Sequence, residues 1–174
     1  MEIPEGFRAE LLEGVITVVR PPGGMHEDVV SLITEQIVRG SAERMAISGN
    51  RGIHLGVTDA ISPKNHVIPD LVVAPRRIGP FRDEESWMDP DGVEMVVEVT
   101  SQDVQRDRVI KYRSYAKAGI PIYLLVDRKA RTTTAMFEPD QGTGVYALSK
   151  SAAFGDDLAL PPPFSFTLNT SEFA

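Results

Sequence analysis

Apolar residues change their spacing several times along the chain, which indicates strands and helices in alternation. From Val29 to Ile37 they recur at helical spacing, and Gly40 follows as a stop. A second helix is predicted over about 105–118, and Gly119 after it suits a left-handed cap. Short β-branched or aromatic runs bounded by glycine and proline predict strands. These strands are expected over residues 11–19, 44–48, 53–57, 67–73, 96–101, 121–127, 132–137 and 145–149.

The connections between these elements favour one α/β unit. The two strands expected between residues 44 and 57 should pair around a turn at 49–52. An acidic loop should span about 75–92, and the tail with prolines 161–163 should pack in extended form. No repeat, low-complexity tract or linker divides the chain. Residues 1–174 are therefore expected to form a single domain, with one mixed β-sheet flanked by helices.

Composition narrows the class of protein. The 174 residues contain no cysteine, which excludes disulfides, thiolate metal sites and cysteine nucleophiles. The three histidines argue against a histidine-rich zinc centre. No run approaches the roughly 18 apolar residues of a membrane-spanning helix, and the first residues lack the basic start and apolar stretch of a signal peptide. A cytoplasmic protein is therefore expected.

Charge is distributed unevenly along the chain. The formal net charge of −7 argues mildly against a nucleic-acid-binding protein, because affinity for phosphates needs local basic residues. Lysine and arginine nevertheless concentrate in residues 106–117 and 128–131, and acidic residues concentrate in 83–91. The acidic total can therefore conceal a basic face, although an ordinary solvated helix would show the same charges.

Two of the predicted strands carry a carboxylate inside an apolar run. Asp70 interrupts the run 67–73, and Glu98 interrupts the run 96–101. A carboxylate buried in this way is costly unless it is paired or binds a cation. Mg²⁺ and Mn²⁺ prefer hard oxygen ligands, so Asp70, Glu98 and the backbone carbonyl of Val99 are predicted to share one ion. Such an ion would polarise a phosphoryl oxygen and acidify a bound water, as phosphodiester hydrolysis requires.

Lys111 is the candidate that completes this hydrolytic set. It lies in the predicted helix that follows the Glu98 strand, so its side chain can return over the end of that strand and favour deprotonation of the water. Asp107 and Tyr115 lie four residues to either side, on the same helical face. The alternative is an Asp107–Lys111 surface pair with a structural role only.

Further residues have both a functional and a structural interpretation. Glu10 or Glu13 could add an acidic ligand or belong to a turn, and His26 could approach a phosphate or stabilise the start of a helix. Thr100 and Ser101 most simply cap the segment that enters the next helix. The remaining expectations are core packing for Tyr115 and Tyr123, a turn for Asp127, and a lid or interface anchor for Trp87.

The order and spacing of these residues resemble a known family. The matching positions are Pro69-Asp70, Glu98-Val99-Thr100-Ser101, Asp107, Lys111, Tyr115 and Gly119 to Asp127, preceded by Glu10 to Val15 and His26. Over about residues 10–127 the chain is similar to the Uma-type putative restriction endonuclease family of the PD-(D/E)XK nuclease superfamily. The resemblance implies a restriction-endonuclease-like α/β core and a Mg²⁺- or Mn²⁺-dependent endonuclease that hydrolyses DNA.

The resemblance also implies individual roles: Asp70 and Glu98 would bind the metal, and Lys111 would take the role of the active-site lysine. One position departs from the superfamily pattern, because Thr100 stands where that lysine usually follows the second acid. Two alternatives stay open: a nuclease-fold binding or regulatory module without catalysis, and a phosphoesterase acting on RNA or small nucleotides. Nucleic acid is the expected partner, with DNA first. A homodimer is expected because two sites can cut both strands of a duplex.

Overall fold

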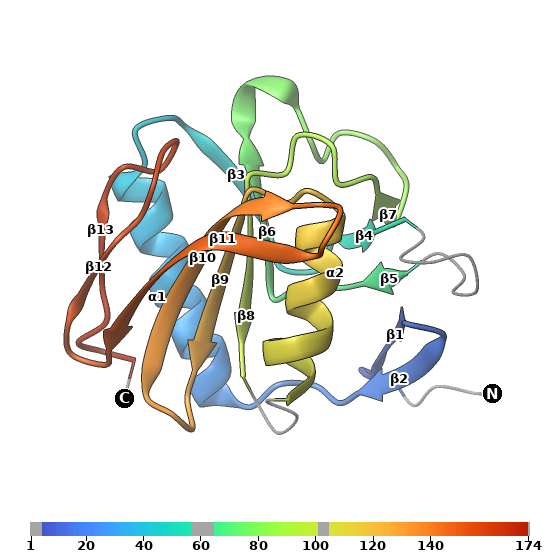
Figure 1. Cartoon of the computed structure of the whole chain (residues 1–174), viewed down its shortest axis with the longest axis horizontal. Coiled ribbons are helices and arrows are strands. Elements are labelled where there is room, and N and C mark those ends of the chain that lie inside the picture. Colours follow the sequence, from blue (N-terminus) through green and yellow to red (C-terminus); the bar gives the residue numbers. More distant parts are fainter. Residues whose placement is uncertain (1–4, 57–64, 101–104, 174) are drawn as a thin grey trace.

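A six-stranded mixed sheet lies at the centre of the protein (Figure 1). The computed structural model describes residues 5–56, 65–100 and 105–173. The strands of this sheet are β3 (Met45–Ser48), β6 (Leu71–Pro75), β8 (Met95–Val99), β9 (Ile122–Asp127), β10 (Thr132–Asp140) and β11 (Val145–Ala153). Their order is β11-β10-β9-β8-β6-β3, with only β8 and β9 parallel. Every residue of β6, β8 and β9 is buried, which explains why nearly all of their residues are apolar.

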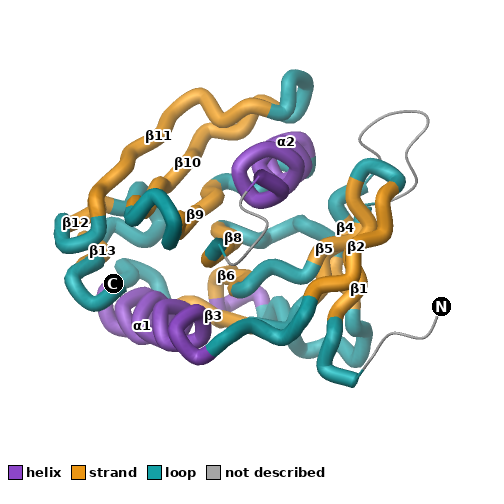
Figure 2. Tube along the Cα trace, turned by 90° about the horizontal axis from the view of Figure 1, so that it is seen from below, coloured by secondary structure: helices purple, strands orange, loops and turns teal. Residues whose placement is uncertain are grey.

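Helical segments cover both faces of this sheet (Figures 1 and 2). They are α1 (Gly24–Gly40), the π-helical segment η2 (Arg106–Lys111) and its continuation α2 (Tyr112–Lys117). The apolar stripe of α1 packs against Val97 and Val99, whereas Tyr115 of α2 packs in the cluster that contains Val96. Because successive strand residues point to opposite faces, Glu98 lies on the α2 face. No helix in the described part of the chain is long and apolar enough to cross a membrane.

A second sheet of short strands lies beside the central one (Figure 2). Its strands are β1 (Arg8–Leu12), β2 (Val15–Val19), β4 (Gly52–His54), β5 (His66–Val67) and β7 (Trp87–Met88), in the order β2-β1-β5-β4-β7. The remaining elements are a 3₁₀ turn η1 (Arg76–Ile78) and a two-stranded sheet of β12 (Asp157–Ala159) and β13 (Thr167–Asn169). The predicted α/β fold is confirmed, but the described strands divide among three sheets where one was expected.

Two expected strands and one expected strand pairing are therefore corrected. Residues 11–19 form part of the β1–β2 hairpin, because Glu13 and Gly14 both adopt positive φ, as a two-residue turn of type I′ requires. The expected pairing around 49–52 is wrong: β3 pairs with β6, and β4 pairs with β5. The run 67–73 is divided between β5 and β6, in different sheets. Val57, the expected end of one strand, lies outside the described residues.

Both predicted helices are confirmed within the described residues, and the tail differs from its prediction. Gly119 ends the second helix with φ of +74°, the left-handed conformation expected there. The prolines 161–163 do not run extended; they lie in the connection between β12 and β13. This hairpin buries Phe164 and Leu168 in the same cluster as α1, so the tail helps to close the core on that side.

Candidate active site

The pairing of β6 with β8 brings the two predicted carboxylates together. Leu71 pairs with Val97 in antiparallel register, so Asp70, one residue before β6, lies opposite the end of β8 that carries Glu98 and Val99. The backbone N–H of Val99 donates to Asp70 Oδ2 at 2.8 Å. Asp70 thus precedes its strand instead of interrupting it, and a backbone hydrogen bond fixes it beside β8.

Glu98 is almost fully buried, with 3% of its surface exposed. Lys111 Nζ donates to Glu98 Oε2 at 2.8 Å, and the hydroxyl of Tyr115 donates to Glu98 Oε1. Burial raises the pKa of Glu98 well above its ordinary value; Lys111 opposes this effect, and nearby carboxylates, Asp70 and Asp107 among them, raise the pKa further. The site therefore contains more carboxylate charge than the Lys111 amine compensates, an arrangement that favours an additional cation.

Lys111 is buried at the end of η2 and surrounded by carboxylates. Its Nζ lies 2.8 Å from Glu98 Oε2, 3.5 Å from Glu10 Oε1 and 3.8 Å from Asp107 Oδ1. Burial opposes the charged amine, but these carboxylates outweigh burial and raise the pKa of Lys111 above its ordinary value. The amine is therefore a fixed cation at neutral pH. The Asp107–Lys111 pair is not a surface pair, since the two side chains are only 14% and 7% exposed.

Glu10 connects the second sheet to this site. Its Oε1 accepts a hydrogen bond from the backbone N–H of Ile68 at 2.8 Å, and its Oε2 lies 2.5 Å from Arg106 Nη2. Arg106 and Lys111 both belong to η2, so Glu10 joins β1 to the helical segment that carries the amine. The sequence gave two interpretations of Glu10, as an acidic ligand or as a turn residue. In the structure Glu10 is buried and lines the site.

His26 approaches Asp70 from the first turn of α1. His26 Nε2 lies 3.0 Å from Asp70 Oδ2. Burial lowers the pKa of His26, but Asp70 and the neighbouring Glu27 outweigh burial, so the pKa lies above 6.5. Asp70 is therefore held from two sides, by α1 and by the backbone of β8.

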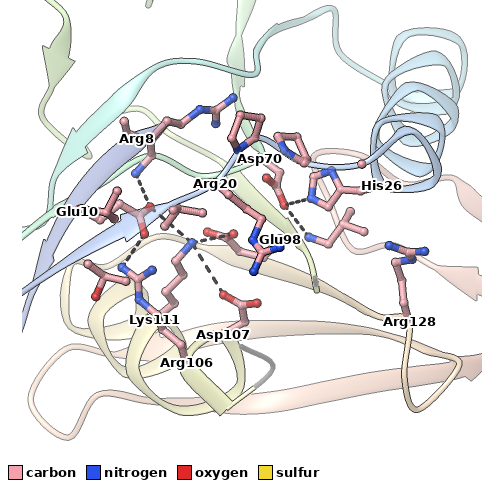
Figure 3. Close-up of a pocket in the computed structure, with 18 residues that line it drawn as sticks. Arg8, Glu10, Arg20, His26, Asp70, Glu98, Arg106, Asp107, Lys111 and Arg128 are labelled. Atoms are coloured by element: carbon pink, nitrogen blue, oxygen red, sulfur yellow. Dashed lines mark hydrogen bonds and ion pairs between the residues drawn. The ribbon is translucent and has the colours of Figure 1, made fainter. Parts of the chain in front are cut away.

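These side chains line one pocket of about 680 Å³, shown in Figure 3. Residues of β1 and β2 form one wall, and residues of β8 and η2 form another. The titratable and charged residues that line it are Arg8, Glu10, Arg20, His26, Asp70, Glu98, Arg106, Asp107, Lys111 and Arg128. The structure thus brings Asp70, Glu98 and Lys111, predicted from separate segments of the sequence, into a single cavity.

Other residues considered in the sequence lie elsewhere. Trp87 packs against two histidine rings of the second sheet. Asp127 pairs with Arg108 and accepts a hydrogen bond from the turn that follows it, as expected of a turn residue. Glu13 pairs with an exposed arginine side chain. Ser101 lies outside the described residues.

Asp107 and Arg106 are pocket residues to which the sequence gave no function of their own. The signals in the sequence were the position of Asp107 one helical turn before Lys111, its place among the positions that resemble the Uma-type family, and the concentration of basic residues that includes Arg106. Two tyrosines expected to be core residues also hold the site in place. The hydroxyl of Tyr123 donates to the backbone carbonyl of Asp107 at 3.0 Å, and Tyr115 donates to Glu98.

The oxygen donors of the pocket fit a hard divalent cation. Asp70, Glu98 and Val99 line the same cavity, and two carboxylates with a backbone carbonyl are ligands that Mg²⁺ and Mn²⁺ prefer. Glu98 retains acceptor capacity beside Lys111 and Tyr115, because each carboxylate oxygen has two lone pairs. Within residues 5–56, 65–100 and 105–173, no group of three or more histidine, aspartate or glutamate side chains could hold a metal ion. A bound ion would thus need the carbonyl, water or substrate as further ligands.

Asp107 gives a pH-dependent prediction. Burial raises its pKa from 3.8 to about 6, against the opposing effect of Lys111. Because the folded-state pKa lies above the unfolded value, the folded protein binds the extra proton, and stability falls as pH rises from about 4 to about 6. Relative to wild type, Asp107→Asn should therefore gain about 3 kcal/mol in free energy of unfolding between about pH 4 and pH 7, measured by urea denaturation. The exposed Asp156→Asn is the control; the same pH dependence in both variants would contradict the prediction.

The family model Uma2, putative restriction endonuclease, matches residues 1–171. A crystal structure of a putative nuclease belonging to DUF820 from Anabaena variabilis ATCC 29413 matches with a TM-score of 0.69 and 17% sequence identity, covering 99% of this chain and 92% of that chain. None of the curated proteins matches.

The fold is therefore that of a nuclease-like α/β protein. The chain belongs to the Uma2 family of putative restriction endonucleases, so the resemblance seen in the sequence is confirmed.

Proposed function

We propose that the protein is a metal-dependent endonuclease that hydrolyses DNA phosphodiester bonds. The observation that carries the proposal is the Lys111 amine, 2.8 Å from Glu98 Oε2 in the pocket that also contains Asp70. Thr100 occupies the position at which the superfamily usually has its lysine, and its hydroxyl instead accepts a hydrogen bond from the backbone N–H of Arg128. The helical segment η2 supplies an amine to Glu98 in its place.

Each residue of the site has a separate role in this proposal. Asp70, Glu98 and the backbone carbonyl of Val99 would hold Mg²⁺ or Mn²⁺, which when bound would polarise a phosphoryl oxygen and acidify a water. Lys111, protonated across the neutral range, would stabilise negative charge that develops on the phosphoryl group. Asp107, with a pKa of about 6, would be ionised above neutral pH and able to accept a proton from the water.

Supercoiled plasmid tests this function directly. The wild-type protein should nick plasmid with Mg²⁺ or Mn²⁺ and not in EDTA, whereas Asp70→Asn/Glu98→Gln should be inactive in every condition. Glutamine suits the buried position of Glu98, because it preserves volume and its amide oxygen can still accept the hydrogen bond from Lys111, while its NH2 group can donate to the hydroxyl oxygen of Tyr115. Nicking that is independent of metal, or equal in the double variant, would overturn the proposal.

Metal-binding and cleavage assays on the same purified protein distinguish the two alternative functions. Metal binding that depends on Asp70 and Glu98, without cleavage of any substrate, would indicate a binding or regulatory module. Cleavage of RNA or small nucleotides, with plasmid left intact, would indicate a phosphoesterase of that class. The homodimer expected for a double-strand nuclease is a prediction that analytical ultracentrifugation of the wild-type protein tests.

A further inference from the structure

Most basic residues of the segment 106–117 are already paired with the protein's own acids. The pairs are Arg106–Glu10, Arg108–Asp127, Lys111–Glu98 and Arg113–Glu13. The sequence indicated this segment as a candidate basic face, but its charges are largely compensated within the fold. Contacts to an anionic substrate must therefore come chiefly from other cations.

Two arginines of the pocket are available for this purpose. Arg8 and Arg128 line the cavity, and neither guanidinium has a hydrogen bond or ion pair within the part of the chain that the structure describes. Both residues are half-buried and line the cavity, so the charge of each lies beside the pocket and is only partly solvated. In Figure 3 the two side chains lie on opposite sides of Asp70 and Glu98.

Each of these arginines lies close, along the chain or through a backbone hydrogen bond, to a strand that carries a carboxylate of the site. Arg8 lies two residues before Glu10 on β1, so both side chains point to the same face of that sheet. Arg128 directly follows β9, and its backbone N–H donates to the hydroxyl of Thr100 at 3.0 Å, two residues after Glu98. The two guanidinium groups therefore approach the carboxylates from different sheets.

We infer that Arg8 and Arg128 bind the phosphates on either side of the phosphodiester group that lies at Asp70 and Glu98. Arginine suits this role because its planar guanidinium can donate two hydrogen bonds to one phosphate. A substrate that reaches both arginines has several phosphates in a row, which defines a polynucleotide strand and not a mononucleotide. The strand crosses the pocket between the end of β9 and the β1–β2 hairpin. This inference rests on the proposed nuclease function and names the form of its substrate.

Binding without metal tests the strand path separately from hydrolysis. Fluorescence anisotropy in EDTA would measure the affinity of the full chain for a fluorescein-labelled 20-nucleotide DNA, single-stranded and duplex, at several salt concentrations. Arg8→Gln and Arg128→Gln should each weaken binding about 3- to 10-fold and reduce the salt slope by about 0.7 for the single strand and about 0.9 for the duplex. Arg39→Gln changes the same charge on an exposed side chain of α1 and should leave the slope unchanged.

Additional variants and ligands in the same binding assay distinguish the possible outcomes. Arg8→Lys keeps the charge and should restore part of the salt slope, which separates a phosphate contact from a loss of folding. Equal binding by the pocket variants and Arg39→Gln would overturn the path, as would a mononucleotide that competes as well as the 20-nucleotide strand. Arginine-dependent binding to RNA above DNA would support the path and contradict the DNA preference. Arginine-dependent DNA binding in a protein that never nicks plasmid would support the path and overturn only the nuclease.

Discussion

Lys111→Met is expected to lower the free energy of unfolding by about 3–5 kcal/mol at alkaline pH, the cost of leaving a buried charge without its partner. Lys111 lies 2.8 Å from Glu98 Oε2 and within 4 Å of both Glu10 and Asp107, so the substitution leaves three carboxylates around an apolar side chain. Urea denaturation measures the loss. Lys150→Met, on the exposed surface of β11, removes the same charge and should cost little.

The pH dependence of this loss identifies its cause. Lys111 is the neighbour that opposes the raised pKa of Glu98, so without the amine Glu98 takes up a proton more readily. Protonation removes the uncompensated charge, and the difference from wild type should therefore shrink as pH falls toward about 5. The double variant Lys111→Met/Glu98→Gln should regain part of the stability at alkaline pH. A loss of equal size at both pH values, without recovery in the double variant, would mean that Lys111 contributes by packing alone.

Asp70→Asn is expected to slow Mn²⁺-dependent nicking about 1000-fold, since a metal that stabilises the transition state contributes about 4 kcal/mol. The fold should be retained, because the amide oxygen can still accept the hydrogen bond from the Val99 N–H. Plasmid nicking measures the rate, and titration calorimetry with Mn²⁺ measures the affinity for metal, which should fall as well.

The exposed Asp156→Asn provides the matched control for Asp70, because it removes one carboxylate from the turn after β11. It should nick plasmid at the wild-type rate. Undiminished nicking by Asp70→Asn would remove the proposed site. Lost nicking with undiminished Mn²⁺ affinity would leave Asp70 a role in positioning and transfer metal binding to other groups.

The sequence predicted the central elements because their signals are local. Val29, Ile33 and Ile37 recur at helical spacing, and they are the buried stripe of α1. Apart from Glu98 and the terminal Asp127, the residues of β8 and β9 are apolar, because both faces of those strands are covered. Glu98 stood out for the same reason: a carboxylate in a fully buried strand needs a partner.

The errors arose where pairing is decided at long range. The turn at 49–52 favoured a local hairpin, yet β3 pairs with β6 and β4 pairs with β5, in different sheets. Alternation of apolar and polar residues indicates which face of a strand is buried, but it does not name the neighbouring strand. Gly14 did carry a local signal, since glycine readily adopts the positive φ that the tight turn between β1 and β2 requires.

The sequence by itself therefore determined the α/β class and the helix faces, and it predicted the two carboxylates and the lysine that the structure brings into one pocket. Only the tertiary structure decided what surrounds Lys111. Glu10 comes from another sheet, and its contact with Lys111 cannot be predicted from spacing, because the two residues are far apart along the chain. The structure also decided which cations remain for a substrate: the basic segment of η2 and α2 pairs with the protein's own acids, whereas Arg8 and Arg128 face the pocket. The physical reason is the same in both cases, because charge pairing depends on distance in space and on burial, and the folded packing sets both.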